Sequence, residues 1–131
     1  MNAAERLKLL PVVMPEQDAA ERVHNVREVP FGFTPAMAQQ EALRCLQCVN
    51  QPCVEGCPVG VRIHEFIQAI ESGDYLAGIG IIKGTNLLPA VCGRVCPQEE
   101  QCQKNCTVGK AHLDVGQAVH IGKLELFLAD W

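Results

Sequence analysis

The sequence has few aromatic residues, few charges and no long apolar run. Aromatic residues make up 5% of the 131 residues and charged residues 20%, and the net charge is −4. The chain therefore lacks the basic patch and the stacking platform that are typical of nucleic-acid binding. Its longest apolar run, Leu76–Ile82, is far too short to cross a bilayer. Neither nucleic acid nor a membrane is an expected partner.

The N-terminus also lacks the pattern of a secretory signal. Its first residues, MNAAERLKLLPVVMPEQD, contain no uninterrupted apolar stretch and no small-residue cleavage pattern. A cytoplasmic location is therefore expected. Because cytoplasmic thiols are kept reduced, the eight cysteines are not expected to form a disulfide framework. Paired cysteines in such a chain are typical of metal sites.

The cysteines form two groups with different spacings. The first group, C-x2-C-x4-C-x3-C-P, consists of Cys45, Cys48, Cys53 and Cys57. The second group, C-x3-C-P-x4-C-x3-C, consists of Cys92, Cys96, Cys102 and Cys106. A zinc site would favour two tight C-x2-C pairs, and only one is present. Three cysteines on one loop with a distant fourth suit an iron–sulfur cluster, so the pattern predicts a cage for two clusters.

Two other metal hypotheses are less consistent with the pattern. A zinc-stabilised interaction module without a redox role is the alternative that stays open. A Rieske centre would need two histidines inside the cysteine loops, and none lies there. The four histidines are expected at surface or capping positions: His24, His64, His112 and His120.

Helical signals dominate the rest of the chain, so we expect an all-α fold. Thr34 and Pro35 are typical of a helix start, and this helix would lead toward Cys45. Apolar residues at helical spacing predict a second helix from Ile63 that Gly73 ends.

Two more helices are expected nearer the C-terminus. Asp74 is expected to cap a segment beginning at Tyr75, for which a helix is favoured over a short strand. The last predicted helix extends over Asp114–Trp131. Residues 1–33 are predicted to be a polar arm outside the core, and residues 34–131 to be the cluster domain.

The sequence resembles the N-terminal iron–sulfur domain of the small (β) subunit of NADPH-dependent glutamate synthase. The matching pieces are MPEQD (14–18), RVHNVREVPFGFT (22–34), EALRCLQC (41–48), PC and CPV (52–59), IHEFIQAIESGDY (63–75), NLLPAVCGRVCPQEEQC (86–102) and IGKLELFLADW (121–131). The domain is also similar to those of dihydropyrimidine dehydrogenase and NADH-dependent ferredoxin–NADP oxidoreductase. The resemblance implies an α-helical ferredoxin fold with two 4Fe–4S clusters. His64 departs from the family, in which a proline often starts this helix.

The resemblance also implies a place in a larger oxidoreductase. In that family, flavin- and nicotinamide-binding modules with G-x-G-x-x-G loops follow this domain, and the sequence contains no such loop. An excised domain, or less readily a stand-alone homologue, is therefore expected, without FAD, NADPH or a catalytic residue of its own. The implied partners are the flavin/NADPH module and the glutamate synthase large subunit. The clusters would carry electrons between them.

The assignment of ligands rests on both spacing and resemblance. Cys45, Cys48 and Cys53 are expected to hold the first cluster, while Pro58 turns Cys57 toward the second. The resemblance implies Cys106 as the distant fourth ligand of the first cluster. It leaves the second cluster to three thiols: Cys57, Cys96 and Cys102.

The eighth ligand is either Cys92 or Glu125. Counting cysteines favours Cys92, but a carboxylate at position 125 is costly to bury unless it is paired or bound to metal. In relatives of the dihydropyrimidine dehydrogenase type, the matching position supplies a non-cysteine ligand. We therefore favour Glu125 and expect Cys92 to be a buried structural thiol.

Three further expectations can be compared with the structure. Gly56, Gly60 and Gly93 are expected to let backbone amides approach the cluster sulfurs. Arg94 is expected either to offset cluster charge or to be solvated. The last helix is apolar almost all round, so it is expected to leave an exposed apolar face at Leu126, Phe127 and Trp131 that favours self-association.

Overall fold

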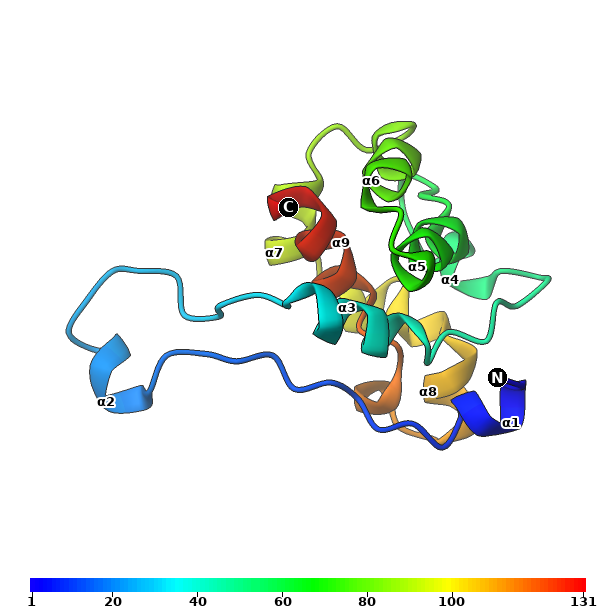
Figure 1. Cartoon of the computed structure of the whole chain (residues 1–131), viewed down its shortest axis with the longest axis horizontal. Coiled ribbons are helices and arrows are strands. Elements are labelled where there is room, and N and C mark those ends of the chain that lie inside the picture. Colours follow the sequence, from blue (N-terminus) through cyan, green and yellow to red (C-terminus); the bar gives the residue numbers. More distant parts are fainter.

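The chain folds into short helices joined by loops, as Figure 1 shows for the computed structural model of residues 1–131. The α-helices are α1 (Ala3–Arg6), α2 (Ala19–Arg22), α3 (Pro35–Ala42), α4 (Pro52–Glu55), α5 (Ile63–Ser72), α6 (Tyr75–Lys83), α7 (Pro89–Val95), α8 (Thr107–Ala111) and α9 (Ile121–Asp130). Three 3-10 helices are η1 (Gln98–Glu100), η2 (Gln103–Asn105) and η3 (Val115–Gln117). The only β interaction is an isolated bridge between Glu16 and Pro30. The all-α prediction is confirmed.

Three helices begin or end at the residues predicted from the sequence. The Thr34 hydroxyl accepts a hydrogen bond from the Met37 amide at 3.3 Å and caps α3. Gly73 ends α5 with a φ of 80°, which favours glycine because it has no Cβ. The Asp74 carboxylate accepts from the Ala77 amide at 3.1 Å and starts α6, so a helix rather than a strand forms there.

The last predicted helix is wrong in its first part, because α9 begins only at Ile121. The segment before it forms η3 and then an extended stretch. There the His120 amide donates to Glu41 at 2.9 Å, and the Ala118 carbonyl accepts from Arg44 at 3.1 Å. These side chains satisfy the backbone groups that a continuous helix would have paired internally.

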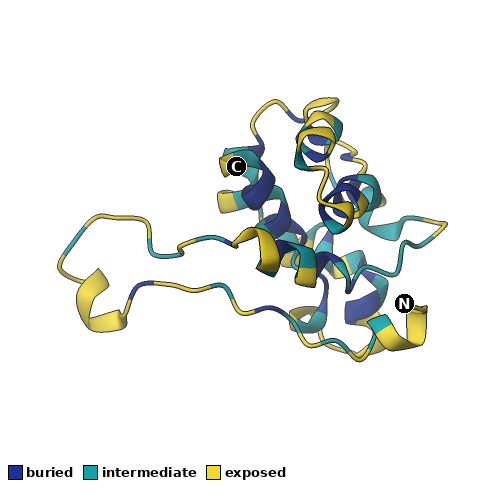
Figure 2. Ribbon diagram, viewed as in Figure 1, coloured by how far each residue is buried: buried dark blue, intermediate teal, exposed yellow.

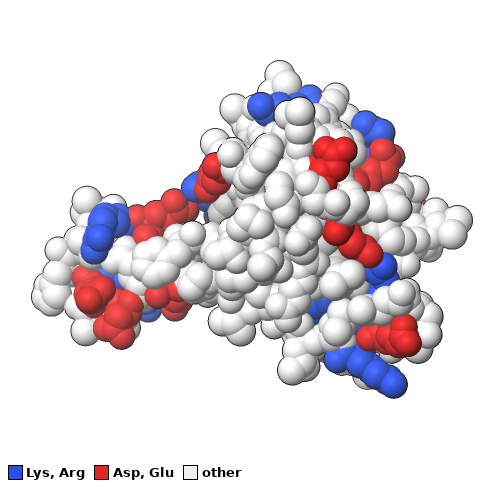
Figure 3. All heavy atoms as spheres, viewed as in Figure 1, with Lys and Arg blue, Asp and Glu red and all other residues white.

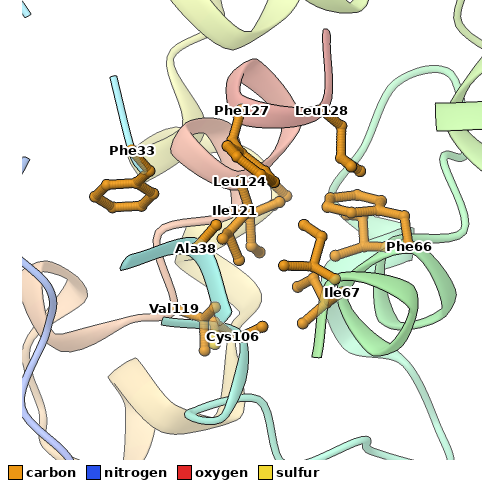
Figure 4. Packing of buried hydrophobic residues seen from close by; sticks show 14 of the residues in the cluster. Phe33, Ala38, Phe66, Ile67, Cys106, Val119, Ile121, Leu124, Phe127 and Leu128 are labelled. Atoms are coloured by element: carbon orange, nitrogen blue, oxygen red, sulfur yellow. The ribbon is translucent and has the colours of Figure 1, made fainter. Parts of the chain in front are cut away.

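Helix α9 forms the centre of the core and contacts α3, α5, α6 and α7. Figure 4 shows Leu124, Phe127 and Leu128 of α9 opposite Phe66 and Ile67 of α5. In Figure 2 the buried residues follow these two helices, while the loop that carries α2 is largely exposed. The core is therefore built mainly from the segments that flank the two cysteine groups.

The prediction that α9 leaves an exposed apolar face is wrong. Leu126 and Phe127 retain only 5% and 7% of their surface exposure. Leu126 packs on Gly93 of α7, and Phe127 makes an edge contact with Tyr75 of α6 at 5.1 Å between ring centroids. Only Trp131 stays exposed, although its ring also contacts Tyr75. The neighbouring helices of the same domain cover the apolar surface of α9.

The N-terminal segment runs along the body and then projects from it around α2 (Figure 1). Val12 and Phe33 belong to the core, so residues 1–33 do not lie wholly outside it. Arg6 pairs with Glu71 of α5 through two hydrogen bonds of 2.7 and 2.9 Å. On the face shown in Figure 3, acidic and basic side chains gather over the projecting part.

A fully buried ion pair joins this segment to the core. Arg44 and Glu41 are both 0% exposed, and their side chains meet at 2.6 Å. Glu41 also accepts from the Val12 amide, while Arg44 donates to the carbonyl groups of Leu9 and Ala118. Each charge is thus surrounded by hydrogen-bond partners, which offset the cost of removing it from water.

Candidate metal centres

Four cysteines line a first cavity, with a volume of about 20 Å³, between the loop after α3, α4 and the start of α8. They are Cys45, Cys48, Cys53 and Cys106. The other walls are mainly apolar and include Leu46, Ile67, Val108 and Val119. The sequence prediction grouped these four cysteines, and the structure brings them to one place.

Local structure explains how the first cysteine group reaches this cavity. Helix α3 ends at Ala42, and Cys45 follows it in a turn. The Cys45 amide donates a hydrogen bond to the Ala42 carbonyl. Gln47 and Gln51 both have positive φ values, 53° and 46°, so the chain reverses sharply on either side of Cys48. Pro52 then opens α4, on which Cys53 lies. Cys106 lies next to the first residue of α8.

A second cavity, with a volume of about 110 Å³, lies between α7, α9 and the loop after Cys96. Its walls include four cysteines and one carboxylate: Cys57, Cys92, Cys96, Cys102 and Glu125. Both candidates for the eighth ligand therefore line this cavity. Cys102 and Cys106 are close in sequence but line different cavities.

Two of the three glycines lie where chain segments pack closely. A Cβ at Gly56 would lie 2.5 Å from the Gln101 carbonyl oxygen, so glycine lets the two cysteine segments touch. A Cβ at Gly93 would lie 2.9 Å from the backbone nitrogen of Leu126, so glycine lets α7 approach α9. Gly56 and Gly93 thus bring chain segments together around the cavities. At Gly60 the φ of 62° favours glycine, and no neighbouring atom would limit a side chain.

Burial makes the ionised thiolates unfavourable in the protein without metal. It raises the pKa of Cys45 and of Cys102 to about 12, and that of Cys53 and of Cys96 to about 11. Desolvation is the largest cause at each of these thiols, and neighbouring cysteines add repulsion. A cationic group placed among the thiols would remove this penalty. Metal binding to these cysteines would therefore release their protons.

The Glu125 carboxylate is held by an amide. Asn86 donates from Nδ2 to Glu125 Oε1 at 2.8 Å, and burial raises the pKa of Glu125 to about 7 although this hydrogen bond lowers it. The Asn86 Oδ1 in turn accepts from the Leu88 amide at 2.9 Å and from the Cys92 thiol at 3.7 Å. Asn86 thus orients both candidates for the eighth ligand.

The two cavities share part of their walls. Ile63, at the start of α5, and Ile121, at the start of α9, line both of them. These side chains are 2% and 3% exposed. A thin layer of apolar side chains from two helix starts therefore separates the two groups of thiols and excludes water between them.

The donor chemistry fits iron–sulfur clusters. No three His, Cys, Asp or Glu side chains converge closely enough to hold a single metal ion. The thiols line the walls of two cavities, which suits a polynuclear group bound at several corners. Thiolates are the ligands that such clusters use, and dry, apolar walls are typical of their surroundings.

The sequence did not place three polar residues at the cavities. Thr107 accepts a hydrogen bond from the Cys48 thiol at 3.1 Å, and Asn86 contacts Glu125. His64 lines the first cavity, unlike the surface or capping position expected for it. Its departure from the proline that often starts this helix in the family was a signal at this position, but that signal does not locate a cavity.

Arg94 lines neither cysteine cavity. Its guanidinium pairs with Glu28 and Asp130, each at 2.7 Å, and these contacts raise its pKa. Of the two expectations, the solvated one is confirmed. Arg94 borders the largest hollow of the molecule, of about 860 Å³, between the N-terminal segment, α7 and α9. That hollow contains none of the cysteines.

Comparison with known proteins places the cysteine pattern in a family. Residues 22–131 match the family model described as dihydropyrimidine dehydrogenase domain II, 4Fe-4S cluster. The chain is 37% identical over 115 residues to the glutamate synthase [NADPH] small chain of Halomonas elongata, covering 88% of this chain and 24% of that protein. It is 36% identical over 118 residues to the NAD-dependent dihydropyrimidine dehydrogenase subunit PreT of Escherichia coli, covering 90% and 26%.

A third relative extends the match over nearly the whole chain. The putative oxidoreductase AegA of Escherichia coli is 33% identical over 133 residues, covering 99% of this chain and 20% of that protein. The chain thus spans about a quarter or less of the length of these curated relatives. None of its helices combines the length and apolar character needed to cross a membrane. The chain belongs to the 4Fe–4S family of dihydropyrimidine dehydrogenase domain II, an electron-transfer domain of oxidoreductases.

Proposed function

We propose that this domain relays single electrons through two 4Fe–4S clusters, one in each cysteine cavity. The observation that carries the proposal is the presence of two separate cavities, each with at least four thiol or carboxylate side chains, that share the walls Ile63 and Ile121. When bound, 4Fe–4S clusters supply reversible one-electron transfer. The domain itself has no catalytic residue in this proposal.

In the first cavity, four thiols act as ligands. They are Cys45, Cys48, Cys53 and Cys106, which line one cavity despite their separation in sequence. The Thr107 hydroxyl lies 3.1 Å from Cys48 and would donate a hydrogen bond to the bound thiolate. Such contacts to ligand sulfur stabilise its negative charge.

In the second cavity, we assign three thiols and one carboxylate as ligands. They are Cys57, Cys96, Cys102 and Glu125. Glu125 already lies against a hydrogen-bond donor, Asn86, and a positive partner would offset the burial that raises the pKa of its carboxyl group. Cys92 donates to Asn86 and would position it, as a structural thiol beside the cluster.

The parent protein is proposed to be a glutamate synthase-like oxidoreductase. The match to glutamate synthase small chains supports this, as does a domain that spans only about a quarter of their length. A flavin/NADPH module, with FAD and NADPH, would then deliver the electrons, and a large subunit would receive them. The match to PreT favours a second candidate, an NAD-dependent dihydropyrimidine dehydrogenase subunit.

Anaerobic reconstitution of the chain with iron and sulfide tests the cluster proposal. The expected product is brown, contains about eight iron atoms per chain, and is bleached by dithionite. Mössbauer spectra should show two 4Fe–4S centres. A colourless protein that binds two zinc ions and gains no iron would contradict the proposal in favour of a zinc-stabilised interaction module.

A test of the parent enzyme is separate. The reduced domain should reoxidise rapidly when mixed with the large subunit of a glutamate synthase, and slowly with the pyrimidine-binding subunit that accompanies a PreT-type protein. The reverse preference would favour the second candidate. Either result leaves the cluster proposal intact, since that rests on iron content and spectra.

A further inference from the structure

The first cavity contains a buried polar atom without a partner. The Nδ1 atom of His64 is inaccessible to solvent and makes no hydrogen bond. A buried donor or acceptor that lacks a partner costs free energy, so such atoms are rare in folded proteins. Because His64 lines the cavity of the first four cysteines, its missing partner is expected there.

The start of α5 also indicates that a binding partner lies in the first cavity. Ile63 and His64 are its first residues, both line the first cavity, and no side chain caps this end of the helix. The free backbone amides and the helix dipole favour a negatively charged group at this position. A cluster held by four thiolates carries such a charge. The helix start and the imidazole would then both face the same anionic group.

We propose that His64 donates a hydrogen bond from Nδ1 to a sulfur atom of the cluster in the first cavity and raises its reduction potential. A neutral imidazole has one N–H donor, so the bond needs no change of charge at His64. A donor at sulfur stabilises the reduced, more negative cluster over the oxidised one. The inference rests on the proposed function, because a cluster in this cavity is the acceptor.

The contrast with other residues makes the inference specific. His64 is the only histidine that lines either cysteine cavity. His112 contacts the Leu7 carbonyl, and His120 borders the outer hollow. Gln47 also has a buried amide nitrogen without a partner, but it lines neither cavity. An effect of histidine on a cluster must therefore come from His64 and be confined to the first cluster.

Pulsed electron paramagnetic resonance of the unmodified chain gives the most direct test. In protein grown with ¹⁵N-histidine and partly reduced, the signal of the first cluster should show a weakly coupled nitrogen. The signal of the second cluster should not. The first signal is the one lost in the Cys106→Ser variant. A first cluster without nitrogen coupling would overturn the inference while leaving the two-cluster function intact.

Substitution provides the second test. His64→Leu should lower the midpoint potential of the first cluster by about 59 mV, which corresponds to a tenfold change for one electron. In His64→Asn the amide nitrogen can take the place of Nδ1, so the first cluster should recover most of its original midpoint potential. The midpoint potential of the second cluster should equal that of the unmodified protein within error in both variants. An unchanged potential in His64→Leu with full iron content would overturn the inference. If the variant fails to bind iron, the labelling experiment decides alone.

Discussion

The two cysteine cavities differ in their polar neighbours more than in their thiols. The first presents potential donors to sulfur, Thr107 and His64, and is narrow. The second is wider and contains Glu125, whose pKa burial raises to about 7. Donors to sulfur stabilise the reduced state of a cluster, whereas the proposed Glu125 ligand replaces a thiolate with a carboxylate of the same charge and adds no such donor. The comparison teaches that one short domain can give two clusters different potentials, and we expect the first to have the higher one.

The sharpest way to break this comparison is to remove one thiol from each cavity. Cys102 and Cys106 are four positions apart but line different cavities. Cys106→Ser should abolish the first cluster and Cys102→Ser the second, each with loss of about half of the iron. Iron analysis and electron paramagnetic resonance would measure this. If both variants lose the same signal, the division of cysteines between the cavities is wrong.

A smaller but more specific effect is expected from the eighth ligand. Glu125→Ala should disrupt the second cluster, because the carboxylate is the proposed ligand, whereas Cys92→Ala should retain it. Iron content and the second cluster's resonance signal distinguish the two variants. Glu125→Gln is the matched control for charge, since it keeps an oxygen donor. The opposite result, loss only in Cys92→Ala, would assign the ligand to Cys92.

The buried ion pair supports the first cavity more than the second. Arg44→Met would leave the Glu41 carboxylate buried and unpaired, which typically costs about 3–5 kcal/mol. Because Arg44 precedes Cys45, the first cluster should be lost at lower urea concentration than the second. Chemical unfolding with both cluster signals as probes measures this. The double variant Glu41→Leu/Arg44→Met should recover part of the loss, and equal loss of both clusters would contradict the prediction.

The contact between α7 and α9 supports the second cavity in a corresponding way. In Gly93→Ala the new Cβ would meet the Leu126 backbone, and overpacking of this kind costs about 1–3 kcal/mol. The second cluster should then be less stable in unfolding experiments. Gly80→Ala is the matched control, because nothing lies within 4 Å of its Cβ. That helix substitution should stabilise the chain by about 0.5–1 kcal/mol.

The smallest expected effect concerns a single hydroxyl. Thr107→Val keeps the shape of the side chain but removes the group 3.1 Å from Cys48. The first cluster should then have a slightly lower midpoint potential, while the second stays unchanged. Redox titration followed by electron paramagnetic resonance would detect the difference. A shift of both clusters would show that the effect is not local.

The sequence was sufficient where the determining interactions are short-range. Thr34, Gly73 and Asp74 mark helix boundaries because their hydrogen bonds or backbone angles involve residues within a few positions. The two cysteine groups and their family resemblance were likewise visible as spacing. These features identified an all-α 4Fe–4S domain before any contact was known.

The sequence was insufficient where distant segments meet. The last helix starts late because Glu41 and Arg44, far away in sequence, bond to the segment before Ile121. The apolar surface of α9 is covered because Gly93 admits α7 against Leu126. Each of these contacts joins residues more than 30 positions apart, and no local pattern encodes which of them will meet.

By itself, the sequence determined the boundaries of α3, α5 and α6 at Thr34, Gly73 and Asp74, the number of thiols and the class of cofactor that suits them. Only the tertiary structure decided that Cys102 and Cys106 line different cavities, that Ile63 and Ile121 form the shared wall, and that His64 lines the first cavity. The physical reason is that helix caps and cysteine spacing act within one turn or loop. A cavity is formed by packing of separate segments, so its walls are fixed only when the whole core is assembled.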